Sequence, residues 1–408
     1  MGKIIYFFRG LLAYALRFLT KWIPRDEKKW AFGAKNSFRD NPKYLFLWTI
    51  ENHPEIKAIW ISQNKKDVLM LREKGLKAYY WLSLSGIWVA LTAKVYVCDH
   101  SLCDVNIFLS GGVFYVNLWH GVSVKRVRWQ DPQLYVKSYK LNDACEMRNS
   151  FFFKMCEYPD LFVNPDFLLV PSKIQSQDFF APMHNVSLEN CVLGIPPRSR
   201  LLLKNKNEVL DFIRKYEPTD TLHLIDKISG YKKVYIYMPT WRYQEQDFLS
   251  ESKINWRTLD DALKKSDSIL LLRFHMFTKV DVSDIGNCEN ILLYPQMSDI
   301  YTVLPFVDCL ITDYSSIYTD FLTMNKEIIL FVYDYELYTK RNDNLDEYNK
   351  YYLAKRVKEF GQLVTIIESK EDCHVPEDLY NYSMEYFWDN NIHDIDIIEE
   401  IKKSNKIK

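Results

Sequence analysis

The chain lacks a net charge, a cysteine pattern and an internal repeat. Its 408 residues carry 53 basic and 53 acidic side chains, so no overall field draws it to nucleic acid and any basic function must be local. The eight cysteines include no Cys-x-x-Cys pair, which argues against a disulfide framework or a clustered metal site. Low-complexity sequence is confined to the lysine-rich last eight residues. We therefore expect no metal, no cofactor and no nucleic-acid partner.

The composition and the pattern of apolar runs predict two α/β domains. With 48% hydrophobic and 26% charged residues, the chain is long enough for two ordinary cores. From residue 28 onward, short apolar runs alternate with longer amphipathic segments, as in parallel sheets wrapped by helices. Prolines at 196 and 197 interrupt this series. We place the two domains at residues 28–200 and 201–375, followed by a helical tail at 376–408.

Twelve apolar runs are the expected strands of these domains. The first domain should hold seven: Lys29–Gly33, Ala58–Ser62, Lys77–Trp81, Lys94–Asp99, Val113–Trp119, Phe167–Pro171 and Asn190–Ile195. The second should hold five: 232–239, Ile269–Phe274, Asn290–Tyr294, Val307–Asp313 and Glu327–Tyr333.

Residues 1–27 are expected to form an amphipathic membrane-associating helix. On a helical wheel, polar and small residues fill an arc of roughly 140° and large apolar residues, including Trp22, fill the rest. Carrying Arg9 and Arg17 through hydrocarbon costs a few kcal/mol each, so we predict a helix lying in the interface with its cations toward the lipid headgroups. A cleaved signal peptide and a helix packed on the protein's own body are the alternatives.

Two groups of polar residues directly follow predicted strands. Trp119-His120-Gly121 closes an apolar run and is followed by Lys125, which places an imidazole and a cation at the carboxyl edge of a sheet. Thr240 and Arg242 follow the first strand of the second domain, and a hydroxyl beside a guanidinium suits an oxygen-rich anion. Both constellations indicate a phosphate-bearing ligand.

Two further constellations lie at the ends of later strands. Arg273 and His275 provide a second cation and imidazole. In the last constellation, Asp313 or Ser315 is expected to cap a helix, so that free amides and the hydroxyls of Ser315 and Ser316 face a ligand. Each of these residues could instead have a purely structural role, as a structural histidine, a surface ion pair or a simple helix cap. Their common location favours phosphoryl transfer in a cleft between the domains.

At these residues the chain resembles the CDP-glycerol glycerophosphotransferase family, which primes or polymerises teichoic acids and related capsular polymers. The resemblance rests on Trp119-His120-Gly121 with Lys125, on residues 238–242, on residues 272–275, and on residues 308–316 with Asp320. Order and spacing agree over roughly residues 30 to 340. The first and last of these motifs together are specific, whereas either alone is weak.

The resemblance implies a GT-B-like fold with two facing Rossmann-like domains, the second holding the donor nucleotide. His120 would be the base for the acceptor hydroxyl, and His275 would lie against the donor phosphates. The other donor or phosphate contacts implied are Gly121, Lys125, Thr240, Arg242, Arg273, Asp313, Ser315, Ser316 and Asp320.

The reaction implied is transfer of a polyol phosphate from a CDP-activated donor to a hydroxyl of a lipid-linked glycan or teichoic acid acceptor, with release of CMP. The expected location is peripheral, at the cytoplasmic face of the cell membrane. A glycosyltransferase of the same fold that uses a nucleotide sugar is one alternative. The other is a membrane-docked binding or scaffold protein that keeps the fold without the chemistry.

Overall fold

A computed structural model of the chain describes residues 2–35, 37–122, 155–156, 158–240, 242, 252–274, 285–295, 298–341 and 346–406. These residues form two compact units. The first unit runs as far as Arg198 and takes in the chain again from Ile392, whereas the second runs from Ser199 to Asn391 and includes Gly121 and Val122.

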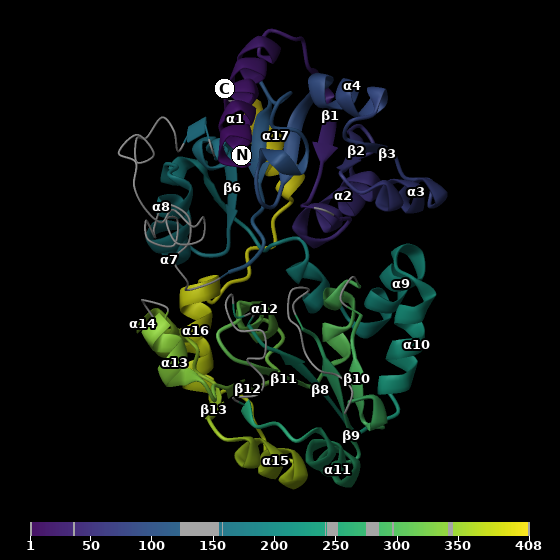
Figure 1. Cartoon of the computed structure of the whole chain (residues 1–408), viewed down its shortest axis with the longest axis vertical. Coiled ribbons are helices and arrows are strands. Elements are labelled where there is room, and N and C mark those ends of the chain that lie inside the picture. Colours follow the sequence, from purple (N-terminus) through teal and green to yellow (C-terminus); the bar gives the residue numbers. More distant parts are fainter. Residues whose placement is uncertain are drawn as a thin grey trace. The chain divides into compact units, whose positions relative to one another are not determined.

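The first unit is built on a seven-stranded parallel sheet (Figure 1). Its strands are β1 (Asp26–Phe32), β2 (Lys57–Ser62), β3 (Ala78–Tyr80), β4 (Ala93–Cys98), β5 (Phe114–Asn117), β6 (Phe167–Val170) and β7 (Cys191–Leu193). The spatial order is β3-β2-β1-β4-β5-β6-β7. The chain therefore builds outward from β1 to β3, returns to place β4 on the other side of β1, and then builds outward again.

The second unit holds a six-stranded sheet that is parallel throughout. Its strands are β8 (Lys233–Met238), β9 (Ser268–Leu272), β10 (Ile291–Leu293), β11 (Cys309–Thr312), β12 (Glu327–Phe331) and β13 (Lys355–Val357). The order β10-β9-β8-β11-β12-β13 reverses direction between β8 and β11. At such a reversal the loops after the two central strands diverge, which leaves the carboxyl ends open for a ligand.

Parallel strands covered by helices on both faces need continuous apolar runs, and this chain supplies them. Every residue of β9 is buried, as is every residue of β5, β6 and β11. The twelve predicted strands are confirmed, together with the α/β class and its two parallel sheets. Among the described strands, only β13 was not predicted, because two of its three residues are exposed and charged and it carries no apolar run.

Helices connect the strands. Those of the first unit are α1 (Gly2–Thr20), α2 (Asp40–Asn52), α3 (Lys65–Glu73), α4 (Leu84–Thr92), α7 (Lys173–Gln175), α8 (Ala181–His184) and α17 (Ile397–Lys406). Those of the second are α9 (Lys206–Tyr216), α10 (Thr219–Ile228), α11 (Trp256–Ser266), α12 (Ile317–Leu322), α13 (Tyr335–Arg341), α14 (Asp346–Tyr351), α15 (Phe360–Ser369) and α16 (Glu377–Trp388). Figure 1 shows α11 and α15 side by side below the second sheet, and the tail beyond residue 376 is divided between the units.

Helix α1 packs on the first unit through its small and polar residues. Gly10 lies so close to the carbonyl of Cys156 that a Cβ would clash, Ala13 is buried, and the Thr20 hydroxyl accepts a hydrogen bond from the Gly111 amide. Large apolar side chains face outward, each between 52% and 66% exposed: Phe8, Leu12, Phe18 and Leu19. Trp22, just beyond the helix, is 75% exposed.

The orientation of α1 differs from the predicted one, in which the cations point to lipid headgroups. The Nε atom of Arg17 is buried, and burial lowers the pKa of its guanidinium. Arg9 stays exposed, with its guanidinium 5.8 Å from the ring centre of Phe108. None of the described helices combines the length and apolarity needed to cross a bilayer. The small arc of the helix faces the protein because only small side chains let two backbones approach closely.

Candidate active site

In the first unit, the turn after β5 places His120 at the carboxyl edge of the sheet. Trp119 has a left-handed φ of 52°, a conformation that costs a non-glycine residue on the order of 1 kcal/mol or more. Two buried asparagines hold it there. The Asn117 side chain accepts from the Trp119 amide at 2.8 Å, and Asn41 Nδ2 donates to the Trp119 carbonyl at 2.7 Å. Both backbone polar groups of Trp119 are therefore hydrogen-bonded to a buried side chain, which holds the strained turn in place.

The imidazole of His120 is oriented by a backbone acceptor and two ring neighbours. Its Nδ1 lies 3.2 Å from the carbonyl oxygen of Asp99. Because a carbonyl only accepts, Nδ1 carries the hydrogen and Nε2 carries the lone pair of the neutral ring. The ring centre lies 4.1 Å from that of Trp119 and 4.3 Å from that of His100. This tautomer is the one that a general base needs.

The segment that accepts this hydrogen bond from His120 carries two buried carboxyl groups, those of Asp99 and Asp104. One oxygen of Asp104 accepts from the amides of Asp99, His100 and Ser101. Burial and the neighbouring Asp104 raise the pKa of Asp99 well above its usual range. Burial also raises the pKa of Asp104 to about 6, although the amide donors oppose the shift. Two carboxyl groups this close share a proton more readily than they both ionise.

In the second unit, Asp313 occupies the reversal point between β8 and β11. One of its oxygens accepts from the Thr240 hydroxyl at 2.6 Å and from the Tyr314 amide at 2.5 Å, and both oxygens lie within 3.1 Å of the Thr240 amide. The other oxygen accepts from Arg242 Nη2 at 2.9 Å. This carboxylate therefore ties the loop after β8 to the loop after β11.

Arg242 is enclosed by carboxylates and tyrosine rings. Its Nε donates to Asp334 at 2.9 Å, and its guanidinium carbon lies 5.2 Å from the ring centre of Tyr314 and 4.7 Å from that of Tyr338. Burial alone would lower the pKa of Arg242, but the Asp313 and Asp334 carboxylates outweigh it and raise the pKa above its usual value. The cation is permanently charged and held in place.

These contacts correct one prediction. Neither Asp313 nor Ser315 caps a helix through its side chain: α12 begins after Ser316, which makes no side-chain capping hydrogen bond. The carboxylate of Asp313 is drawn instead to the buried guanidinium of Arg242, because an uncompensated buried charge costs far more than an unmade cap.

The remaining predicted site residues have different surroundings. Asp320 is buried and accepts from the hydroxyls of Ser199 and Tyr301, both at 2.7 Å. Arg273 donates to the carbonyl of Pro295 and lies 5.5 Å from the ring centre of Tyr294. Ser315 and Ser316 are half-buried beside Asp313, and Gly121 directly follows His120. Lys125 and His275 lie outside the described residues.

Sequence reasoning missed three residues of these two edges. Asp334 lies three residues after the end of β12, and His100 lies two after the end of β4, so the same strand-end rule would have found both. The sequence predicted no functional role for His100. Asn41, which holds Trp119, sits in α2 and gives no such signal.

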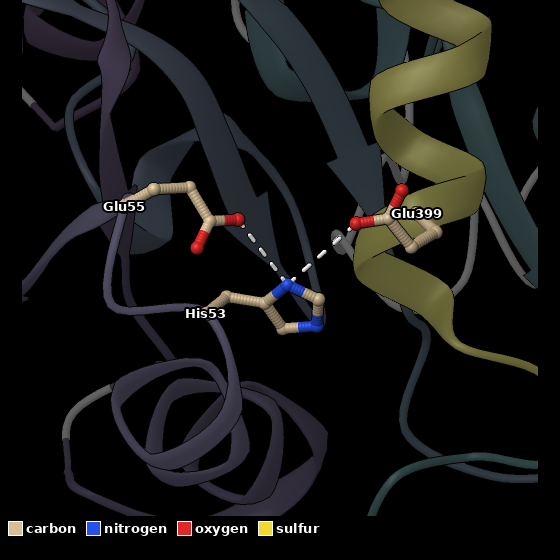
Figure 2. Close-up of side chains that lie close together, drawn as sticks. All are labelled: His53, Glu55 and Glu399. Atoms are coloured by element: carbon tan, nitrogen blue, oxygen red, sulfur yellow. Dashed lines mark hydrogen bonds and ion pairs between the residues drawn. The ribbon is translucent and has the colours of Figure 1, made fainter.

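A third polar cluster, in the first unit, joins the end of α2 to α17. Figure 2 shows His53, Glu55 and Glu399 with their polar atoms converging, an arrangement that could hold a metal ion. The ammonium of Lys402 lies 2.5 Å from Glu55 and 2.7 Å from Glu399, and it is 3.5 Å from His53 Nδ1. The ammonium of Lys402 therefore already pairs with both carboxylates.

Comparison with known proteins gives concordant matches. A profile of the family described as CDP-Glycerol:Poly(glycerophosphate) glycerophosphotransferase matches residues 16–389. The chain is 26% identical over 356 residues to a teichoic acid poly(glycerol phosphate) polymerase of Bacillus spizizenii, covering 84% of each protein. It is 27% identical over 308 residues to the corresponding polymerase of Bacillus subtilis, covering 73% of this chain but 37% of that one. The structure of the wall teichoic acid polymerase TagF superposes with a TM-score of 0.68 at 19% identity, covering 100% of this chain and 96% of that one.

Proposed function

The chain belongs to the CDP-Glycerol:Poly(glycerophosphate) glycerophosphotransferase family and is therefore a transferase; on this premise we propose the details of its reaction. The donor is CDP-glycerol or a close relative such as CDP-ribitol. The acceptor is a hydroxyl of a lipid-linked teichoic acid or cell-surface glycan. The products are a phosphodiester and CMP.

The observation that carries the proposal is the fixed tautomer of His120. With Nδ1 donating to the Asp99 carbonyl, Nε2 can take the proton of the acceptor hydroxyl. The oxygen then attacks the phosphorus bonded to the polyol, and the bond from that phosphorus to CMP breaks. The electron pair leaves with CMP, so the atoms and charges balance without a redox partner.

The second unit supplies the donor side in this proposal. Arg242 makes hydrogen bonds to Asp313 and Asp334, so it acts by holding together the loops that follow β8, β11 and β12. The half-buried Ser315 and Ser316 then present hydroxyls and amides to the diphosphate. From their motifs, Lys125, Arg273 and His275 are the proposed cationic contacts to the donor phosphates.

The apolar face of α1 supports a peripheral position on the membrane. Its outward side chains would enter the outer part of the hydrocarbon layer, because exposing several large apolar groups to water is unfavourable. Residues 1–25 contain no acidic side chain, and the basic side chains of Arg9 and Lys21 are exposed, which suits anionic headgroups. Helix α4 adds a second exposed patch, with Leu84 at 88% and Trp88 at 63%.

Vesicle binding tests this position at what we propose is the cytoplasmic face. Joint replacement of Phe18 and Trp22 by serine should weaken sedimentation with vesicles that contain phosphatidylglycerol. The matched control is Leu379→Ser, which removes an exposed leucine from α16 of the other unit. Unchanged binding of the double variant would contradict the membrane role of α1 while leaving the transfer reaction untouched.

Turnover of the purified full chain with CDP-glycerol and a lipid-linked acceptor tests the reaction. His120→Ala should reduce CMP release by about 10²- to 10⁴-fold, the usual contribution of a general base. His223→Ala, which removes an exposed histidine from α10, should leave the rate unchanged. Turnover of a UDP-sugar without CMP release would favour the nucleotide-sugar alternative. A donor that raises the melting temperature without turnover would favour a binding protein.

A further inference from the structure

The sheet brings two imidazoles together at the carboxyl edge of the first unit. Strands β4 and β5 are parallel neighbours, and Cys98 is in register with Asn117. His100 follows the first of these strands by two residues, and His120 follows the second by three. The left-handed turn at Trp119 compensates for the extra residue, and the rings stack with their planes 20° apart.

The backbone of His100 is held independently of His120. Its amide donates to Asp104 at 2.8 Å, within a capping box in which Ser101 and Asp104 satisfy each other's backbone donors. Its carbonyl lies 3.5 Å from Asn117 Nδ2. The ring of His100 therefore starts from a fixed backbone and can serve as a surface against which His120 is positioned.

From this geometry we propose that His100 is a positioning residue whose ring face holds His120 in the plane required for proton transfer. The inference rests on the proposed function. His100 does not touch substrate in this proposal. Its ring packs face to face with the imidazole, and Trp119 contacts the imidazole from an adjacent side, with its ring centre 6.1 Å from that of His100, while Nδ1 donates to Asp99.

The same face favours the charge that appears during the reaction. His120 gains a proton from the acceptor hydroxyl and becomes an imidazolium, and an aromatic face beside a cation attracts it. A neutral ring at position 100 therefore stabilises the protonated intermediate state of His120, whereas a cationic side chain there would repel it. An aliphatic side chain would fill the space without either effect.

The test compares side chains at position 100 in steady-state CMP release by the full chain. His100→Leu and His100→Gln, which remove the ring, should lower kcat about tenfold and leave KM for CDP-glycerol within about twofold. His100→Phe, which keeps an uncharged ring, should stay within about threefold of the parent kcat. His100→Lys should be less active than His100→Leu. His223→Leu is the control for a histidine remote from the stack, and melting temperatures identify any variant that fails to fold.

Two outcomes would overturn the inference alone. One is full activity of both ringless variants in a protein that His120→Ala inactivates. The other is equal loss of kcat in the phenylalanine and the ringless variants, since the ring face would then be irrelevant. A fully active His120→Ala protein would instead overturn both this inference and the proposed base.

Discussion

The two sheets carry opposite kinds of polar groups at their carboxyl edges. The first unit places an imidazole among aromatic rings, and its segment after β4 carries a pair of buried carboxyl groups whose pKa values are raised. The second unit places a buried guanidinium between two carboxylates, Asp313 and Asp334, and burial with these partners leaves its charge permanent. One edge is able to exchange a proton, whereas the other is an ion cluster that fixes loop geometry.

This difference shows what a strand-end motif does and does not reveal. His120 and Arg242 follow their strands in similar ways, yet only the imidazole of His120 has a ring nitrogen that can accept a proton, whereas the guanidinium of Arg242 is always charged. The guanidinium is saturated by neighbours far along the chain. The chemistry of each edge is therefore decided by the residues that surround the motif. Mutations at the Arg242 cluster should mainly lower stability, whereas mutations around His120 should also lower activity.

The largest effect is expected at the ion cluster. Arg242→Met removes the only partner that Asp313 and Asp334 share among the described ion pairs and leaves buried carboxylates uncompensated, which typically costs about 3–5 kcal/mol. The melting temperature of the second unit should fall by roughly 6–20 °C. Arg214→Met, which breaks an exposed pair with Asp211, should change it by little. Similar melting temperatures for the two variants would contradict the structural role.

A smaller loss of stability, with a loss of activity, is expected from Asn41→Ala. This change leaves the Trp119 carbonyl and the Arg198 amide without their buried partner, at a cost of about 1–3 kcal/mol. Because Trp119 sets the direction of His120, kcat for CMP release should fall as well. Asn52→Ala, in the last turn of the same helix, removes an exposed hydrogen bond and serves as the control. Normal turnover by a destabilised Asn41→Ala protein would show that the asparagine contact to Trp119 is not needed for catalysis.

The carboxyl pair of the first unit predicts a pH-dependent difference. A carboxyl group whose folded pKa is raised to about 6 favours folding at low pH, and that contribution is lost as the pH rises through 6. Asp99→Asn removes one of the two buried carboxyl groups whose pKa is raised, so its melting temperature should exceed that of the parent at pH 8 by more than at pH 5. Asp220→Asn, at an exposed position, should show no such trend. If the difference in melting temperature between Asp99→Asn and the parent became smaller as the pH rises, the predicted direction of the pH dependence would be wrong.

The smallest effect is expected at the exposed cluster of Figure 2, which provides a baseline for both edges. Lys402→Met removes ion pairs with Glu55 and Glu399 that lie partly in solvent, so the loss should be below about 1 kcal/mol and should shrink in high salt. Lys403→Met, which loses a single exposed pair with Glu400, should change stability even less. A loss as large as that of Arg242→Met would show that this cluster is structural.

Much of the fold and part of the site could be predicted. Runs such as residues 268–272 have no polar face, so they predict buried parallel strands without reference to any partner. The positions after those strands then identified His120, Thr240 and Asp313. The partners of Arg242 could not be predicted, because Asp313 and Asp334 lie 71 and 92 residues away along the chain.

The amino-acid sequence by itself determined the class of fold, the strands and the family, because these depend on local apolar runs and short motifs. It also determined that α1 has two faces. Only the tertiary structure decided that the small face packs inward, that Arg242 is held by two carboxylates, and that His100 stacks on His120. The physical reason is that these outcomes depend on close approach between distant segments, and a linear pattern shows which groups are present but not which ones meet.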